Sequence, residues 1–205
     1  MMYRTEQEKF WAGKFGNDYI KRNQSEFSIA ANLFMWGKIL NHTVDVKSVI
    51  EFGANIGLNL IAQKQLLPGA EFSAVEINKN AVKSMDKLGF IKTYSQSILD
   101  FKVDYKRDFV FTRGVLIHMN PDVLDEIYET MYNTSSKYIC IAEYYNPVPS
   151  EVKYRGFNEK LFKRDFAGEM LKKFKKLHLV DYGFIYHLDK NFPQDDINYF
   201  LLSKK

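Results

Sequence analysis

The stretch "SVIEFGANIGLNL", residues 48–60, decides the fold. It opens with the apolar and aromatic residues of a buried strand and closes with the start of an amphipathic helical pattern. The loop between them, residues 53–57, begins and ends with glycine. Because glycine has no Cβ, its backbone can turn sharply and approach a ligand closely. We therefore expect a strand, a ligand-binding turn and a helix.

The spacing of these glycines disfavours a pyrophosphate-binding loop. A dinucleotide fingerprint needs glycines at relative positions one, three and six, which here are Gly53, Asn55 and Leu58. A second pattern has glycines at positions one, three and five, with an acidic residue two places before the first. Glu51, Gly53 and Gly57 match it, and Asn55 departs from it. Since Asn tolerates left-handed backbone, we expect the turn to form.

A second carboxylate, Glu76, ends the next predicted strand in "AVEIN", nineteen positions after Gly57. A carboxylate at this place can accept two hydrogen bonds from a ribose diol. NAD and S-adenosylmethionine both carry such a ribose, so these residues alone leave both cofactors open.

After residue 48, short strand-like runs alternate with amphipathic helical runs, which is typical of repeated βαβ units. The last two strand-like runs are joined by a loop too short for a helical crossover, so we expect them to pair antiparallel. The prediction is an α/β fold: a mostly parallel seven-stranded sheet with a C-terminal antiparallel hairpin and helices on both faces. The predicted strands are 48–52, 71–76, 90–95, 108–113, 138–144, 177–188 and 196–204, and the helices between them are 57–67, 78–88, 121–134 and 163–176.

Composition excludes several classes of function. The 205 residues carry 29 basic and 25 acidic side chains, a formal net charge of +4 that permits an anionic ligand or RNA without requiring one. Cys140, the single cysteine, lies in an apolar run, so we expect a buried thiol. The histidines lack metal-ligand spacing, and we predict no metal site. With no signal-peptide pattern and no apolar run of about 20 residues, we expect a cytoplasmic protein without a membrane segment.

Three segments together resemble the class I S-adenosylmethionine-dependent methyltransferases: "VIEFGANIG" at 49–57, "AVEIN" at 74–78 and "DFVFTRGVLIHMNP" at 108–121. The resemblance implies a Rossmann-like fold and S-adenosylmethionine as cofactor. It also implies a helical cap or lid at residues 1–45 and a cofactor-binding methyltransferase domain at 46–205, within one globular unit. Packing of the N-terminal aromatic residues against the sheet is the alternative to a lid.

The resemblance assigns roles to individual residues. Glu51 would face the methionyl amino group, and the turn would lie against the methionine part. Glu76 would hold the ribose hydroxyls, and Ile77 would pack on the adenine. The implied cofactor-binding set is Glu51, Gly53, Asn55, Gly57, Glu76, Ile77, Ser97, Ile98 and Arg113. Ser97 stands where many family members have an Asp.

The segments "EKFWAGKFGNDYIKRN" at 8–23, "RGVLIHMNPD" at 113–122, "AEYYNPVP" at 142–149 and "YRGFNEKLFKRDFAGEML" at 154–171 also resemble bacterial methylases associated with pseudaminic acid biosynthesis. This resemblance implies a small polar substrate, an acidic sugar or sugar nucleotide. His118 is the catalytic candidate, as a general base, with packing beneath the cofactor as the alternative. Candidate substrate-binding residues are Tyr144, Tyr145, Asn146, Tyr154 and Arg155.

Two other functions stay open. The excess of basic over acidic residues and the lysine-rich run at 163–176 are compatible with an RNA-modifying methyltransferase, although no RNA-binding module is recognisable. An amphipathic helix with a solvated lysine face explains the same run. The departure at Asn55 and the missing acid at Ser97 keep open a non-catalytic cofactor-binding or scaffolding protein.

Overall fold

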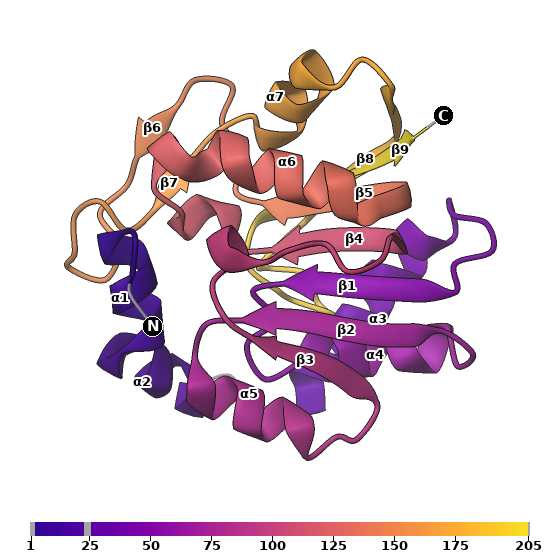
Figure 1. Ribbon diagram of the computed structural model, residues 1–205, viewed down its shortest axis with the longest axis horizontal. Coiled ribbons are helices and arrows are strands. Elements are labelled where there is room, and N and C mark those ends of the chain that lie inside the picture. The colour runs from indigo at the N-terminus through magenta and orange to yellow at the C-terminus, as the bar shows by residue number, and fades with distance from the viewer. Residues whose placement is uncertain (1–2, 23–25, 205) are drawn as a thin grey trace.

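The structure is a computed structural model that describes residues 3–22 and 26–204. Its parallel strands end at one edge of a central sheet, where two short N-terminal helices lie (Figure 1). The helices are α1 (Glu6–Ala12), α2 (Lys14–Arg22), α3 (Glu26–Leu40), α4 (Leu58–Leu66), α5 (Lys79–Asp86), α6 (Leu124–Thr134) and α7 (Phe166–Lys173). The strands are β1 (Ser48–Phe52), β2 (Glu71–Glu76), β3 (Ile91–Ser95), β4 (Arg107–Arg113), β5 (Ser135–Glu143), β6 (Ser150–Glu151), β7 (Phe162–Lys163), β8 (Leu177–Ile185) and β9 (Ile197–Lys204).

Seven strands form one sheet in the order β3-β2-β1-β4-β5-β9-β8. The first five pair in parallel, and β9 pairs antiparallel with both β5 and β8, which confirms the predicted sheet and hairpin. The chain proceeds outward from β1 in one direction and from β4 in the other. Ligands of open α/β sheets bind at such a switch point, beyond the carboxyl ends of the strands. The sheet order therefore places a cleft at the ends of β1 and β4.

Helices cover both faces of the sheet. On one face α3, α4 and α5 pack through Trp36, Leu60 and Met85, and on the other α6 and α7 pack through Ile127 and Met170. Helix α3 is therefore part of the main hydrophobic core. Helices α1 and α2, which we call the N-terminal cap, lie instead at the carboxyl edge (Figure 1). The predicted 1–45 segment includes both parts, and residues 1–2 and 23–25 of it lie outside the described residues.

The region after β5 differs from the prediction. A two-stranded sheet, β6 with β7, forms there, and its strands are too short to leave a periodic pattern in the sequence. Helix α7 begins only at Phe166, where Asp165 caps it by accepting a hydrogen bond from Gly168 N at 2.8 Å. Its buried Phe166 and Met170 confirm the amphipathic interpretation of the lysine-rich run.

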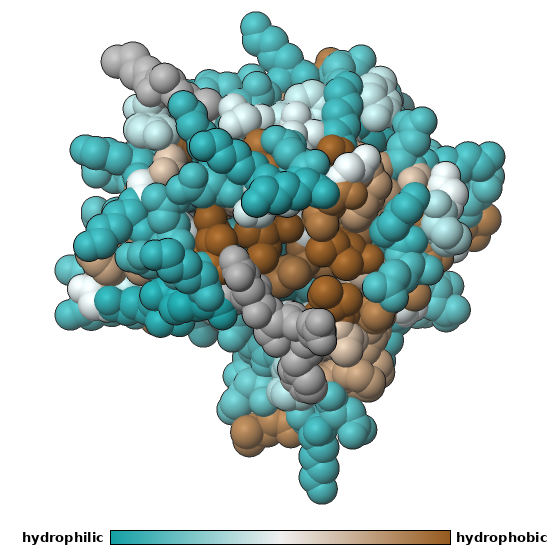
Figure 2. All heavy atoms as spheres, turned by 90° about the horizontal axis from the view of Figure 1, so that it is seen from below, coloured by the Kyte–Doolittle hydropathy of each residue, from teal (hydrophilic) through white to brown (hydrophobic). Residues whose placement is uncertain are grey.

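On the face shown in Figure 2, hydrophilic side chains project around most of the outline, and apolar side chains gather in a hollow near the centre. No helix in residues 3–22 or 26–204 is long and apolar enough to cross a membrane.

The loop between β1 and α4 makes the turn that its sequence predicts. Gly53, Asn55 and Gly57 have φ angles of +77°, +49° and +82°, so all three take left-handed backbone. Asn55 therefore fits the position where the motif has glycine. A Cβ at residue 53 would lie 2.6 Å from Cγ2 of Val115, so this glycine is also required by contact with the loop after β4.

Gly53→Ala should destabilise the protein by about 2–4 kcal/mol. The alanine would be strained in left-handed backbone, and its Cβ would clash with the side chain of Val115. Gly37→Ala is the matched control: a Cβ there meets nothing within 4 Å, and it removes a glycine from inside α3. The control should gain up to about 1 kcal/mol. Urea unfolding measures both changes, and a Gly53→Ala protein as stable as the wild type would contradict the described turn.

Candidate functional site

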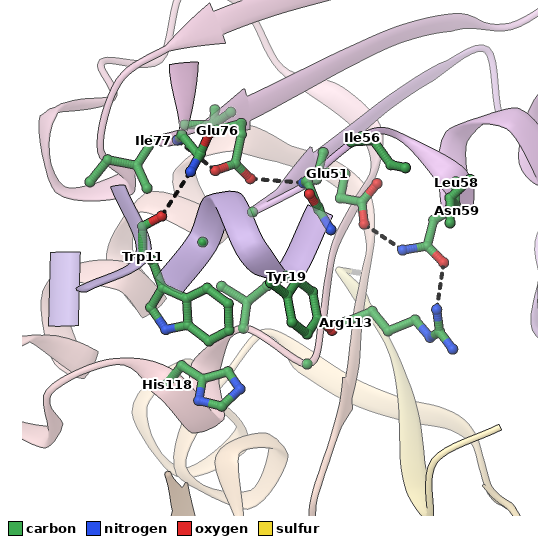
Figure 3. Close-up of a pocket in the computed structure, with 18 of the residues that line it drawn as sticks. Trp11, Tyr19, Glu51, Ile56, Leu58, Asn59, Glu76, Ile77, Arg113 and His118 are labelled. Atoms are coloured by element: carbon green, nitrogen blue, oxygen red, sulfur yellow. Dashed lines mark hydrogen bonds between the residues drawn. The ribbon is translucent and has the colours of Figure 1, made fainter. Parts of the chain in front are cut away.

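A cleft of about 320 Å³ lies at the carboxyl edge, between the sheet and the N-terminal cap. The strand ends, the loops that follow them and the N-terminal cap all contribute polar side chains to its wall (Figure 3). The predicted site residues that line it are Glu51, Gly53, Asn55, Glu76, Ile77, Ser97, Ile98, Arg113 and His118. These residues lie between positions 51 and 118, and the complete lining runs from Gln7 to Ile197.

Glu51, from β1, is buried in this cleft with 1% of its surface exposed. Its Oε1 accepts a hydrogen bond from Asn59 Nδ2 at 2.6 Å, while Oε2 is buried and has no partner in the described part of the chain. Burial raises the pKa of Glu51 to about 8, although the Asn59 hydrogen bond and the Arg113 charge oppose the shift. An unpaired buried carboxylate oxygen is costly, so this position suits a cationic N–H donor from a ligand.

Arg113, at the end of β4, faces the same amide. Its guanidinium donates to Asn59 Oδ1 at 3.2 Å and to Gln194 Oε1, and its Nε is buried without a partner among the described residues. Burial lowers the pKa of Arg113. Both hydrogen-bond acceptors are neutral amides. A buried carboxylate oxygen and a buried guanidinium N–H therefore remain on the two sides of Asn59 (Figure 3).

Glu76, at the end of β2, ties the glycine loop to the next strand. Its Oε2 accepts a hydrogen bond from Asn55 N at 2.8 Å, and its Oε1 accepts one from Asn78 N at 2.7 Å. Burial raises the pKa of Glu76, and these backbone N–H groups oppose the shift. Each oxygen of a carboxylate has two acceptor directions, so each can accept one bond more. The pair of oxygens suits two neighbouring hydroxyl groups.

The far end of the cleft is closed by residues of the N-terminal cap. Ser97 donates its hydroxyl hydrogen bond to Glu8 Oε1, and Ser97 Oγ accepts one from Leu99 N at 3.0 Å. Glu8 and Ser97 are both buried and line the cleft together with Gln7. An acidic side chain thus lies next to Ser97, but it comes from α1.

His118 follows β4, and one of its ring nitrogens is already used. Its Nδ1 lies 2.5 Å from the carbonyl oxygen of Lys160; because that oxygen can only accept, Nδ1 carries the proton and Nε2 keeps a lone pair. Burial lowers the pKa of His118 to about 4, so the ring is neutral at pH 7. The rings of Trp11 and Tyr154 lie 4.7 and 4.8 Å from it.

The five predicted substrate residues do not line the cleft. Tyr154 packs on His118, and Arg155 lies 5.8 Å from the Tyr154 ring, so this pair lies next to the lining. Burial and the neighbouring Asp195, a lining residue, raise the pKa of the half-buried Tyr144.

The other predicted residues that do not line the cleft have structural contacts. Tyr145 packs against Phe200, and Asn146 Nδ2 donates to Val148 O at 2.8 Å and to Ser150 Oγ at 3.0 Å. Of the predicted cofactor residues, Gly57 does not line the cleft; it is the N-cap of α4.

Sequence reasoning missed several lining residues. Asn59 left a weak signal, as a polar residue at the second position of the helix that follows the glycine loop. Glu8 left only a helix-start signal, since it forms a capping box with Thr5. The lining residues not predicted as ligands include Gln7, Glu8, Asn32, Asn59, Asn78, Gln194 and Asp195.

The charged lining of the cleft is mainly acidic. It has the carboxyl groups of Glu8, Glu51, Glu76 and Asp195, and among the described lining residues only Arg113 carries a guanidinium. The lysine-rich helix α7 lies elsewhere, and its Lys173 pairs with acidic side chains of α6. This charge distribution favours a small ligand with cationic groups over a polyphosphate chain.

No family model matches the sequence, and no curated protein sequence matches it. Solved structures do share its fold. The plantazolicin methyltransferase BpumL in complex with SAH is 14% identical, with a TM-score of 0.68 over 97% of this chain and 94% of that chain. The 1,6-didemethyltoxoflavin-N1-methyltransferase of Burkholderia thailandensis is 12% identical, with a TM-score of 0.70 over 97% and 87%. The magnesium protoporphyrin IX methyltransferase of Synechocystis PCC 6803 is 12% identical, with a TM-score of 0.65 over the whole of both chains. The chain therefore has the Rossmann-like fold of class I methyltransferases.

Glu51→Gln should stabilise the ligand-free protein at alkaline pH and leave its stability unchanged near pH 4.5. The carboxyl group titrates near 4.5 in the unfolded chain and at about 8 in the folded one. As pH rises between these values, the unfolded chain ionises first, so the wild type loses stability that the variant keeps. Urea unfolding should give a gap of roughly 4–5 kcal/mol near pH 8.5. A gap that does not change with pH would contradict the raised pKa.

Proposed function

We propose that the protein is an S-adenosylmethionine-dependent methyltransferase that acts on a small polar metabolite. The observation that carries the proposal is the pair of unpartnered buried atoms, Glu51 Oε2 and Arg113 Nε, on the two sides of Asn59. An acceptor and a cationic donor so arranged suit the ammonium and carboxylate of an amino acid. Glu76, on the neighbouring strand, suits a ribose diol. S-adenosylmethionine combines these two groups in one molecule.

The same residues argue against NAD. A pyrophosphate needs a helix N-terminus free of negative charge. Here Glu51 lies buried beside the turn before α4, and Leu58 stands where the dinucleotide fingerprint needs its third glycine. A ligand with a net positive charge is compatible with the Glu51 carboxyl group.

S-adenosylmethionine, when bound, supplies a methyl group activated by a sulfonium. The residues of this chain bind and align the reactants and exclude water. We propose that the aromatic side chains of the N-terminal cap, Trp11 and Tyr19, cover the cleft as a lid; their rings lie 5.3 Å apart, and both line it. We propose His118 as the general base, with Nε2 taking the proton that an acceptor hydroxyl or amine loses.

We propose an acidic sugar of the nonulosonic (pseudaminic) type, or its precursor, as the substrate. Its support is the resemblance of the segments around Trp11, His118 and Tyr154, and the packing of those three rings on one another. Sugars stack on aromatic rings through their apolar faces. The exposed Arg155 beside Tyr154 suits the carboxylate of such a sugar, since its guanidinium can bind that group bidentately.

Calorimetric titration tests the cofactor. The wild type should bind S-adenosylmethionine and S-adenosylhomocysteine but not NAD, and Glu76→Ala should weaken binding by roughly 10–100-fold, because the ribose loses its acceptors. Glu71→Ala, at the exposed start of the same strand, is the matched control and should bind as the wild type does. Tight NAD binding, or an unchanged Glu76→Ala protein, would overturn the proposal.

Incubation with methyl-labelled donor tests the substrate. We expect label to enter free acidic sugars or their nucleotide conjugates, and none to enter bulk RNA. His118→Phe keeps a ring in the stack with Trp11 but removes both nitrogens, so turnover should fall by roughly 10²–10⁴-fold while S-adenosylhomocysteine affinity is kept. Label that enters only RNA would overturn the sugar, and full turnover in His118→Phe would overturn the general base.

A further inference from the structure

Helix α1 contributes two buried hydrogen-bond acceptors to one end of the cleft. Gln7 and Glu8 are 4% and 5% exposed, and both line the cleft. They lie at the end beyond Glu76, with Ser97, where Ile77 and Ile98 supply apolar surface. Neither was predicted to bind a ligand, and the proposed function uses neither.

The amide of Gln7 is held with its oxygen unused. Nε2 donates to the carbonyl oxygen of Glu159 at 2.9 Å, which fixes which end of the amide is the donor. Oε1 is buried and has no partner within the described ranges. A buried acceptor without a donor is costly, so this position suits an N–H or O–H group of a ligand.

The carboxylate of Glu8 has one acceptor direction left. Its two oxygens offer about four in all. The backbone N–H groups of Arg4 and Thr5 donate to Oε2 at 2.5 and 2.9 Å, and the Ser97 hydroxyl donates to Oε1. The remaining direction is therefore on Oε1, the oxygen bonded to Ser97 in the cleft wall.

We infer that α1 selects the base of the bound nucleoside, with Gln7 Oε1 and Glu8 Oε1 as acceptors for an exocyclic amino group. This inference rests on the proposed function. A 6-aminopurine has two N–H bonds at this position, whereas a 6-oxopurine has a carbonyl oxygen, which buried acceptors repel. Glu8 thereby supplies the acidic group that the sequence lacks at residue 97.

The wall does not depend on a ligand to hold its shape. Thr5 and Glu8 form a capping box at the start of α1, and the Arg4 guanidinium binds the carboxylate of Glu126 through two hydrogen bonds, of 2.8 and 2.6 Å. At the other end of α1, Asn78 Nδ2 donates to Trp11 O at 3.1 Å. Because α1 is fixed at both ends, we expect single substitutions in the wall to leave the fold intact.

The test compares, by calorimetry, S-adenosylhomocysteine with S-inosylhomocysteine, whose purine has an oxo group at the 6-position and a hydrogen on N1. The wild type should prefer the adenosyl compound by roughly 10–100-fold, because the oxo group leaves both acceptors unpaired. In Glu8→Gln, whose amide can donate to the oxo group, the preference should fall below about threefold. Glu6→Gln, the same change at an exposed position of α1, should keep the wild-type preference.

Each result either supports or contradicts the role of α1. An unchanged preference in Glu8→Gln overturns the inference but leaves the proposed function standing. A wild type that binds neither compound overturns both. If Glu8→Gln fails to fold by circular dichroism, Gln7→Met decides instead: it removes the second acceptor without touching the capping box, and it should weaken adenosyl binding several-fold while inosyl binding does not fall.

Discussion

The side-chain amide of Asn59 stands between two buried ionisable groups, the carboxyl of Glu51 and the guanidinium of Arg113. It donates to Glu51 and accepts from Arg113, and a third bond, from Trp36 Nε1 to Asn59 Oδ1 at 3.1 Å, fixes which end of the amide faces which partner. With the amide so placed, Glu51 Oε2 and Arg113 Nε have no partners among the described residues.

That arrangement costs stability. Burial raises the pKa of Glu51 to about 8, which means that the folded protein resists ionising this carboxyl group. A ligand ammonium bound beside Glu51 would favour the ionised carboxylate and so lower this pKa. Perturbed titration in a cleft is typical of functional sites, because the interactions that bind a ligand are those left unsatisfied without one. The cost to folding and the capacity to bind have the same physical origin.

The N-terminal cap completes the cleft from outside the sheet. Gly16 allows its two helices to pack closely, since a Cβ there would lie 1.9 Å from the carbonyl oxygen of Trp11. The cap brings Glu8 to Ser97 across 89 residues of sequence and covers the space in front of His118 with Trp11. The sheet and the cap are held in place by separate contacts. Residues at the strand ends can therefore carry the chemistry, while residues of the cap select the ligand.

Local chemistry made most of the fold predictable. Glycine at 53 and 57 and Asn between them are the residues that adopt left-handed backbone most readily, and alternating apolar runs mark the strands. Glu51 and Glu76 could be placed because strand ends meet at one edge of a parallel sheet. The short strands β6 and β7 escaped prediction, since two residues carry no periodicity.

The sequence by itself determined the sheet, its hairpin and the carboxyl groups at the strand ends, because these follow from spacing along the chain. Only the tertiary structure decided which other groups face them. Glu8, Gln7 and Gln194 come from segments whose patterns describe helix starts and loops, and their side chains reach the cleft through the docking of elements distant in sequence. Tyr145 and Asn146 show the converse, since they follow a strand end yet point to other partners. The packing of elements that are distant in sequence sets the direction in which such side chains point, and no local sequence pattern indicates that direction.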